Sequence, residues 1–335
     1  MRKVLVTGAT GFIGSHIVTT CLERGDAVAA LVMQGDTEGL VLEKKGVEVF
    51  YGDVRKYKSL EKACEGRDVV FHCAAVATDW APKKLFLDVT VGGMENICKA
   101  SLKAGVKRFI DISTSDVFGL REDITIDETL PLRFWKEPYP DSKIMAEKIA
   151  WKYHREHGLP VSMVYPLWVY GPGDKTFVPL LADAIIKKEM IFWQRGAIVW
   201  PTYIDNLMDL LMIISEDDRA VGNGYLVHDG ISVTLEQFCS GIAKAVNAVE
   251  VNTYIPYAAA YIAAFVMEVV WRLFRIESRP LLTTYTVKNL HSRMVFSIDK
   301  ARKELDWKPV VSFQLGFGET MRWLKTLDLS ELKQK

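Results

Sequence analysis

Three glycines that lie between a predicted strand and a predicted helix constrain the fold more than any other feature. In the stretch VLVTGATGFIGSHIV, Gly8, Gly11 and Gly14 directly follow the short apolar run at 3–7. In a strand–turn–helix unit the first glycine permits a tight turn, the second lets the backbone approach a pyrophosphate, and the third allows close packing of helix on strand. The free N–H groups at the helix start attract the anion. This context predicts a dinucleotide-binding turn.

Short apolar strands and amphipathic helices alternate through the first half of the chain. We expect strands at 3–7, 27–33, 47–51, 69–73, 108–113 and 161–166, and helices at 14–24, 57–64, 89–104 and from Ser142 to His157. Such alternation predicts an α/β fold, a doubly wound parallel sheet of the Rossmann type. Residues 1–170 are predicted to form the NAD(P)-binding domain. A smaller, irregular substrate-binding lobe is expected at 171–335, with some later segments returning to the first domain.

Charge and cysteine content narrow the function classes. Forty-two basic and 42 acidic residues give zero net charge, so no broad basic field exists to bind nucleic acid. The five cysteines are odd in number and contain no CxxC pair, which favours reduced thiols in the cytoplasm and no metal site. The first apolar run reaches Gly8 before a signal-peptide core could develop.

One segment, 254–276, is unusually apolar, and three interpretations of it stay open. Its sequence is YIPYAAAYIAAFVMEVVWRLFRI, with Pro256 at the expected helix start and Glu268 interrupting the apolar run. It is either a partly buried helix of the second lobe, a helix lying on a membrane surface with Arg272 and Arg275 at its polar end, or a membrane span.

The end of the second strand bears on the choice between NAD and NADP. No Lys or Arg occurs between Asp26 and Glu43, which makes a 2′-phosphate hard to bind and favours NAD, although NADP is not excluded. Asp53, after the third strand, is placed to accept a hydrogen bond from the adenine amino group. Alternatively it only caps the next helix.

Tyr139 and Lys143 are four residues apart in PYPDSKIMAE, which places both side chains on one helix face. A tyrosine becomes an acid–base group near neutral pH only where a fixed positive charge stabilises its phenolate, and Lys143 would supply that charge. The hydroxyls of Ser113, Thr114 and Ser115 follow the fifth strand at the ligand-binding edge of the sheet. One of them would bind the substrate oxygen, unless all three serve only as turn or cap residues.

Seven motifs, TGATGFIG, GDV, HCAA, ISTSDVFG, YPDSK, PLWVYGPGD and YIDN, occur in the order typical of a known family. The chain resembles the extended short-chain dehydrogenases/reductases, of the NAD-dependent epimerase/dehydratase type, over nearly its whole length. The resemblance implies catalytic roles for Thr114, Tyr139 and Lys143. It also implies cofactor contacts at Gly8, Gly11, Phe12, Ile13, Gly14, Asp53, Val54, Ala74, Ala75, Tyr139, Lys143, Pro166 and Val169.

Departures from the family pattern refine this expectation. Asp88 stands where the family often has a bracing Asn, Tyr165 precedes Pro166 in place of an Arg, and Phe118 replaces a Tyr. Ser115 and Asp116 occupy the place of the acidic pair of sugar dehydratases, which disfavours a dehydratase. The apolar segment at 254–276 and the sequence after it look most like the 3β-hydroxysteroid dehydrogenase branch.

We therefore expect an NAD(P)-dependent oxidoreductase that transfers hydride between the nicotinamide and a secondary alcohol or ketone of a steroid-like or lipid-like substrate. The alternative is a nucleotide-sugar epimerase of the UDP-sugar 4-epimerase type, which uses the same three residues with retained NAD. A non-catalytic dinucleotide sensor is a third reading, but such proteins commonly lose the tyrosine or lysine.

Other expectations concern the pocket and the assembly. Tryptophans would form pocket walls or core, and arginines would hold a nucleotide diphosphate in an epimerase. The resemblance implies a homodimer formed through the helices at 89–104 and around Tyr139. The protein is expected to be cytoplasmic, with peripheral membrane contact through 254–276 left open. The candidate tryptophans are Trp80, Trp168, Trp193 and Trp200, and the candidate arginines are Arg195, Arg219, Arg272, Arg275, Arg279 and Arg293.

Overall fold

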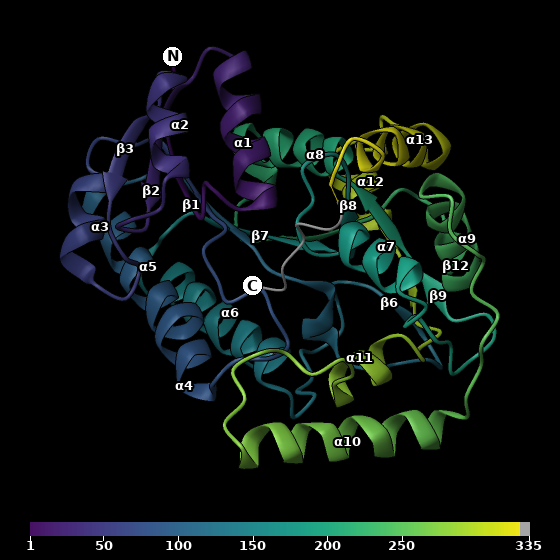
Figure 1. The fold of residues 1–335 in the computed structure, drawn as a ribbon. Coiled ribbons are helices and arrows are strands. Elements are labelled where there is room, and N and C mark those ends of the chain that lie inside the picture. Colours follow the sequence, from purple (N-terminus) through teal and green to yellow (C-terminus); the bar gives the residue numbers. More distant parts are fainter. Residues whose placement is uncertain (329–335) are drawn as a thin grey trace.

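A seven-stranded parallel sheet forms the centre of the computed structural model, which describes residues 1–328 (Figure 1). Its order is β11–β7–β5–β4–β1–β2–β3, so the chain runs outward in one direction from β1 and in the other from β4. This confirms the predicted α/β doubly wound fold. The strands are β1 (Lys3–Thr7), β2 (Ala27–Val32), β3 (Glu48–Tyr51), β4 (Val69–His72), β5 (Arg108–Ile112), β7 (Val161–Pro166) and β11 (Gly224–Val227).

Helices cover both faces of the sheet, as the fully apolar strands require. One face carries α3 (Tyr57–Cys64), α5 (Gly92–Ala104) and α6 (Pro138–His157), which pack side by side (Figure 1). The other face carries α1 (Phe12–Glu23) and α8 (Ile204–Glu216), which contact each other. The structure therefore buries the sheet between two helical layers.

Three helices differ from the sequence expectation. Helix α6 begins at Pro138, not after Ser142, because proline is tolerated in the first turn of a helix, where its missing N–H has no partner to lose. A short helix, α2 (Glu38–Lys44), was not predicted. The helix expected at 89–104 is preceded by α4 (Lys83–Leu85) and a π-helical stretch at Phe86–Val91, so α5 itself starts at Gly92.

The second lobe is assembled from small pairs of strands and short helices on the side of the sheet where β11 lies. Residues 204–227 return from this lobe to the sheet as α8 and β11. The strand pairs are β8 (Trp168–Tyr170) with β10 (Pro201–Tyr203), β9 (Ile198–Val199) with β12 (Val233–Thr234), and β6 (Thr125–Ile126) with β13 (Val295–Phe296). The helices are α7 (Val178–Ile186), α9 (Leu235–Ala245), α10 (Tyr257–Leu273), α11 (Thr284–Asn289), α12 (Asp299–Glu304) and α13 (Phe313–Leu324).

The apolar segment at 254–276 forms α10, a helix that runs along one side of the molecule beside α11 (Figure 1). Its buried residues are Ala260, Ala264 and Glu268. Within residues 1–328, no helix combines the length and the apolar character that crossing a bilayer needs. All five cysteines lie in this part of the chain and carry free thiols.

The glycines of the first turn bring α1 against β1. Gly8 has a positive φ of 67°, a conformation that favours glycine. A Cβ at Gly14 would lie 2.1 Å from the carbonyl oxygen of Gly8, far inside van der Waals contact. The helix can therefore pack this closely on the strand only where residue 14 has no side chain.

Gly14→Ala should destabilise the protein by about 1–3 kcal/mol, because the added methyl forces α1 away from β1. Gly318 in α13 is a matched control, since a Cβ there meets nothing within 4 Å. Gly318→Ala should stabilise the protein by roughly 0.5–1 kcal/mol through helix propensity alone. Urea unfolding of both variants measures the two effects, and equal effects would contradict this account of Gly14.

Candidate active site

The predicted site residues lie along the carboxyl edge of the sheet, where its strand order reverses between β1 and β4. In open α/β sheets, ligands bind in the crevice at this reversal point. Gly8 follows β1, Ala74 and Ala75 follow β4, and Thr114 follows β5. The structure thus brings the glycine turn and the predicted catalytic segment to the two sides of one crevice.

The glycine turn fits a bound dinucleotide. A Cβ at Gly8 would lie 2.9 Å from the backbone nitrogen of Ala74, so the backbone after β1 runs directly beside that after β4. Gly11 is the N-cap of α1, and no side chain caps the helix there. Its first-turn N–H groups, which include those of Phe12 and Ile13, are suited to hold a pyrophosphate.

A lysine that sequence reasoning did not single out lies over this turn. The Lys175 ammonium is 3.5 Å from the carbonyl oxygen of Thr10. The loop that carries Lys175 is anchored to α1, because a ring nitrogen of His16 lies 3.0 Å from the Pro172 carbonyl oxygen. Lys175 therefore adds a positive charge beside the predicted pyrophosphate position, although it is 165 positions from Thr10 in the sequence.

The residues expected around the adenosine are partly engaged by other groups. Asp53 accepts hydrogen bonds from the backbone and guanidinium of Arg55, and the Arg55 hydrogen bond holds the pKa of Asp53 below its usual range. Asp36 accepts from the backbone N–H of Glu38 at the start of α2. Val54 is buried against Gly93. Contact of Asp53 with adenine stays a prediction.

On the substrate side of the crevice, α6 presents Tyr139 and, one turn later, Lys143. Lys143 is buried, and its ammonium donates a hydrogen bond of 2.7 Å to the carbonyl oxygen of Ile112, the last residue of β5. Thr114, two residues further, lies within hydrogen-bonding reach of Tyr139 and also caps a short 3-10 helix at Ser115–Phe118. The three predicted catalytic residues are thus grouped. Pro166 ends β7, and Val169 lies in β8.

The electrostatics of this group favour a protonated tyrosine. Burial raises the pKa of Tyr139 above its ordinary value, and the charges of Asp116 and Asp111 raise it further, while the Thr114 hydroxyl lowers it. The Lys143 charge instead acts on Asp111 and His72, where it lowers both pKa values. Stabilisation of the Tyr139 phenolate by Lys143 therefore stays a prediction.

Asp116 and Tyr285 belong to the site although sequence reasoning gave them no role. The Tyr285 hydroxyl, from α11, donates to Asp116 Oδ2 at 2.5 Å, and the Tyr285 ring lies 6.1 Å from the Tyr139 ring. Burial raises the pKa of Asp116 to about 6. Asp116 lies in the ISTSDVFG motif and was considered only for the dehydratase pair. Tyr285 is 169 residues away, and no local pattern marks it.

A second acidic group lies beneath Lys143. Asp111 is 1% exposed, and neither carboxylate oxygen has a hydrogen-bond partner within the described chain. It pairs in register with His72 of the neighbouring strand, whose Nδ1 lies 2.7 Å from the Thr7 hydroxyl. Burial raises the pKa of Asp111. Asp111 and His72 therefore form a buried group of titratable side chains close enough to Lys143 for its charge to act on both.

The candidate tryptophans divide between core and surface roles. Trp193 and Trp200 donate their indole N–H groups to the carbonyl oxygens of Val287 and Met294, at 3.0 and 2.8 Å, which marks them as packing residues. Trp80 and Trp168 are half-buried and stay candidates for pocket walls.

Asp88, where the family often has a bracing Asn, and three of the candidate arginines form ion pairs with other residues. Asp88 is turned to the surface, where it pairs with Lys84 at 2.5 Å. Arg279 pairs with Asp79, Arg219 with Asp217, and Arg272 with Glu268.

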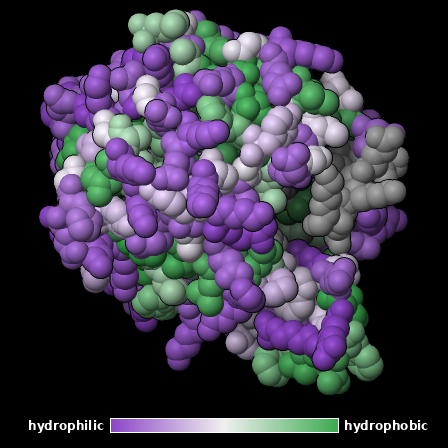
Figure 2. All heavy atoms as spheres, turned by 90° about the vertical axis from the view of Figure 1, so that its left-hand side faces the viewer, coloured by the Kyte–Doolittle hydropathy of each residue, from purple (hydrophilic) through white to green (hydrophobic). Residues whose placement is uncertain are grey.

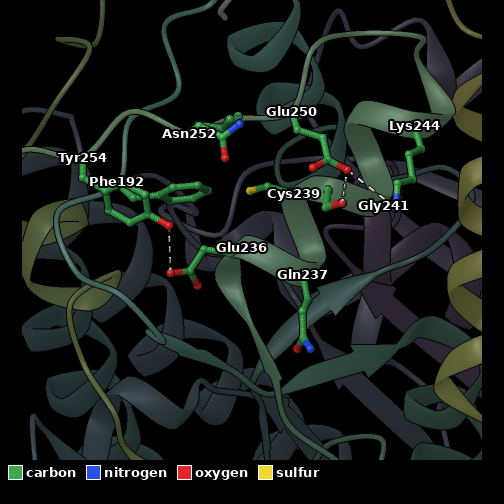
Figure 3. Close-up of a pocket in the computed structure, with 11 residues that line it drawn as sticks. Phe192, Glu236, Gln237, Cys239, Gly241, Lys244, Glu250, Asn252 and Tyr254 are labelled. Atoms are coloured by element: carbon green, nitrogen blue, oxygen red, sulfur yellow. Dashed lines mark hydrogen bonds and ion pairs between the residues drawn. The ribbon is translucent and has the colours of Figure 1, made fainter.

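A pocket of about 460 Å³ lies apart from these residues, between α9 and the segment at 250–254 (Figure 3). Its lining includes Glu236, Lys244 and Glu250, and contains none of the predicted site residues. Lys244 and Glu250 pair with each other at 3.6 Å. This pocket is polar and superficial, and we assign it no part in the chemistry.

The fold and this crevice define a Rossmann-type, dinucleotide-dependent enzyme. The sequence model of the NAD dependent epimerase/dehydratase family matches residues 4–226, more than half of the chain. The chain belongs to this family, and it is an NAD(P)-dependent short-chain dehydrogenase/reductase of the extended type. The resemblance inferred from its motifs is thereby confirmed, as is the expectation of an enzyme that uses NAD.

Individual relatives differ in what they act on. The chain is 29% identical to a 3 beta-hydroxysteroid dehydrogenase/Delta 5→4-isomerase of Mycobacterium tuberculosis, over 98% of this chain and 91% of the relative. It is 28% identical to a 4-hydroxy-2-methyl-3-oxo-4-farnesyl-3,4-dihydroquinoline-1-oxide ketoreductase of Stigmatella aurantiaca, over 94% of each chain. The structure of a UDP-glucose 4-epimerase of Thermotoga maritima superposes with a TM-score of 0.77 at 21% identity, over 97% of this chain and 99% of that one. This last likeness concerns the fold alone.

Asp116→Asn should shift the pH dependence of alcohol oxidation. The Asp116 carboxyl loses its proton near pH 6, and above that pH its charge raises the pKa of Tyr139. Removing the charge should lower the pKa of Tyr139, so the rising limb of kcat/KM should move to lower pH by roughly one unit.

The matched control is Asp26→Asn, which removes a carboxylate bound to Arg2 at the opposite edge of the sheet. Its profile should coincide with that of the unchanged protein. Identical shifts in both variants, or no shift with Asp116→Asn, would contradict the electrostatic coupling of Asp116 to Tyr139.

Proposed function

We propose that the protein transfers hydride reversibly between NAD and a secondary alcohol or ketone on an apolar, steroid-like or lipid-like substrate. The observation that carries this proposal is the grouping of Thr114, Tyr139 and Lys143 at the reversal point of the sheet. A proton donor–acceptor and a second hydroxyl beside the nicotinamide end of the crevice are what carbonyl reduction and alcohol oxidation need.

In the reductive direction, Tyr139 donates its proton to the carbonyl oxygen while the Thr114 hydroxyl holds the same oxygen. Bound NAD supplies the hydride donor or acceptor, and its oxidised ring also adds a positive charge that favours the phenolate. In oxidation, the Tyr139 phenolate takes the hydroxyl proton. We expect Lys143, whose ammonium donates to the Ile112 carbonyl oxygen, to donate also to the nicotinamide ribose and so to orient the ring.

An apolar substrate is supported by the surroundings of Tyr139. The rings of Tyr285 and Trp135 lie 5.6 Å apart, and Tyr285 lies beside Tyr139. On the Tyr285 side of Tyr139 lies the carboxylate of Asp116, which would repel an anionic substrate group. Two relatives named for a hydroxysteroid and a farnesyl-bearing ketone point in the same direction.

The epimerase alternative needs cations that grip a nucleotide diphosphate. Among the described residues, Arg219, Arg272 and Arg279 are already paired with carboxylates. Arg195 stacks on Tyr254, and its carbonyl oxygen accepts from the Arg293 guanidinium. These engagements favour the oxidoreductase over the epimerase, which is retained as the second candidate because a UDP-glucose 4-epimerase shares the fold.

A substrate survey at 340 nm separates the two functions. Hydroxysteroids and long-chain 3-oxo compounds should give a net change in NADH with exchangeable cofactor, and NAD should be preferred to NADP by about tenfold or more, because residues 27–42 hold no cation. Interconversion of a nucleotide sugar with retained NAD and no net redox change would replace the proposal with the epimerase.

Tyr139→Phe should lower kcat by about a thousandfold, because it removes the proton donor. Binding of NAD, followed by quenching of tryptophan fluorescence, should be nearly unchanged. Tyr153→Phe is the control, since Tyr153 lies on the same helix and donates to Glu95 at the surface. Equal turnover by Tyr139→Phe and the unchanged protein would refute the assigned chemistry. Unchanged cellular function of Tyr139→Phe would favour a dinucleotide sensor.

A further inference from the structure

The outer face of α10 is an exposed apolar surface that the proposed function does not use. Ile262, Phe265, Val266, Val269 and Leu273 are 62%, 54%, 51%, 45% and 72% exposed. Their spacing of three, one, three and four residues places them on one side of the helix. Figure 2 shows hydrophobic residues gathered at the lowest projection of the molecule, where α10 lies in Figure 1.

This surface is held rigidly, because the inner face of α10 is well packed. Ala260 and Ala264 are fully buried against Trp193 and Val287. Glu268 is 5% exposed and accepts hydrogen bonds from the backbone N–H and the hydroxyl of Thr284, at 2.7 and 2.9 Å. A well-packed helix therefore presents these apolar side chains to solvent. Exposed apolar patches of this kind mark surfaces that bind a partner or a membrane.

All exposed charge on this helix is positive. Within α10 the acidic residue is Glu268, which is buried, and the basic residue is Arg272, which is exposed; Arg275 and Glu277, both exposed, follow the helix. The Arg272 guanidinium pairs with Glu268 at 3.1 Å and lies 5.1 Å from the centre of the Trp80 ring. Arg275 lies two residues after the end of α10, where it has a positive φ of 53°, and its side chain is exposed.

We infer that α10 binds the surface of an anionic lipid bilayer, lying in the membrane plane with its apolar face in the acyl–headgroup boundary. An apolar stripe with aromatic residues, bordered by arginines at the headgroup level, is the pattern of an interfacial helix. Seventeen residues span roughly 25 Å along the helix axis, which suits lying on the surface. The inference is independent of the substrate proposed above.

A second copy of the chain is the competing occupant, and the charges disfavour it. In a two-fold contact of α10 with itself, Arg272 would face the region of Ala258 on the other copy if the helices ran antiparallel, and the other copy's Arg272 if they ran parallel. No acidic residue lies at 251–267 to pair with it. Phosphate and carboxylate headgroups of an anionic membrane would pair with Arg275, while Arg272 keeps its ion pair with Glu268.

Flotation of the full-length protein with lipid vesicles tests the inference. Vesicles of phosphatidylcholine with phosphatidylserine should carry the protein upward, and vesicles of phosphatidylcholine alone should carry several-fold less. Phe265→Asp combined with Val269→Asp should reduce flotation by about tenfold or more, because two charges replace apolar side chains that would enter the membrane. Arg275→Gln should reduce binding to the anionic vesicles by about fivefold.

Leu315→Asp is the matched control, since Leu315 is 65% exposed on α13 and lies outside the proposed surface. It should float like the unchanged protein. Cofactor binding by every variant, followed by fluorescence, verifies that the fold is intact without relying on the hydride-transfer activity.

Three results would overturn the inference. They are full recovery of the unchanged protein in the soluble fraction with both vesicle types, equal flotation with neutral and anionic vesicles, and unchanged flotation of the double aspartate variant. A change from dimer to monomer in that variant by light scattering, with flotation unaffected, would assign the face to a second copy instead.

Discussion

The contact between the Gly8 carbonyl and the first turn of α1 is the constraint from which the rest of the site follows. Because no side chain separates strand from helix there, the helix start points its free N–H groups into the crevice between β1 and β4. Gly8, Gly11 and the first turn of α1 would hold the pyrophosphate of a dinucleotide there. Tyr139 and Lys143 lie in the first turns of α6, where we expect them to act at the nicotinamide end of the cofactor.

The charged groups around Tyr139 determine its protonation state. Asp116 on the crevice side and Asp111 beneath Lys143 both raise the pKa of the tyrosine, and Lys143 is directed at the Ile112 carbonyl. A tyrosine in such a field holds its proton at neutral pH, which suits the donation of a proton to a carbonyl oxygen. Oxidation would depend more strongly on the positive charge of oxidised NAD. A protonated Tyr139 is therefore ready to donate a proton, as the proposed reduction of a carbonyl requires.

The sequence pattern predicted the elements that short-range interactions determine. The sheet strands up to β7 and helix α3 lie within one or two residues of their expected positions, because apolar periodicity and glycine placement are short-range signals. The predicted start of α6 at Ser142 was wrong, because the first turn of a helix accommodates Pro138 and Pro140. The pairing of Asp116 with Tyr285 could not be predicted, since it joins residues 169 positions apart through an irregular lobe. The exposure of the apolar side of α10 also depends on what packs beside it.

The same network that buries the inner side of α10 reaches the catalytic helix. Thr284 hydrogen-bonds both Glu268 of α10 and Glu137, which directly precedes α6, and Lys288 donates to Glu137 at 2.6 Å. Tyr285, between these residues on α11, contacts Tyr139 through its ring. A helix that lies on a bilayer would thus be separated from the reacting tyrosine by the single short helix α11. An apolar substrate dissolved in the membrane would then have a short path to the site, which gives one physical reason for an exposed apolar helix to occur in the same chain as the proposed activity on a lipid-like substrate.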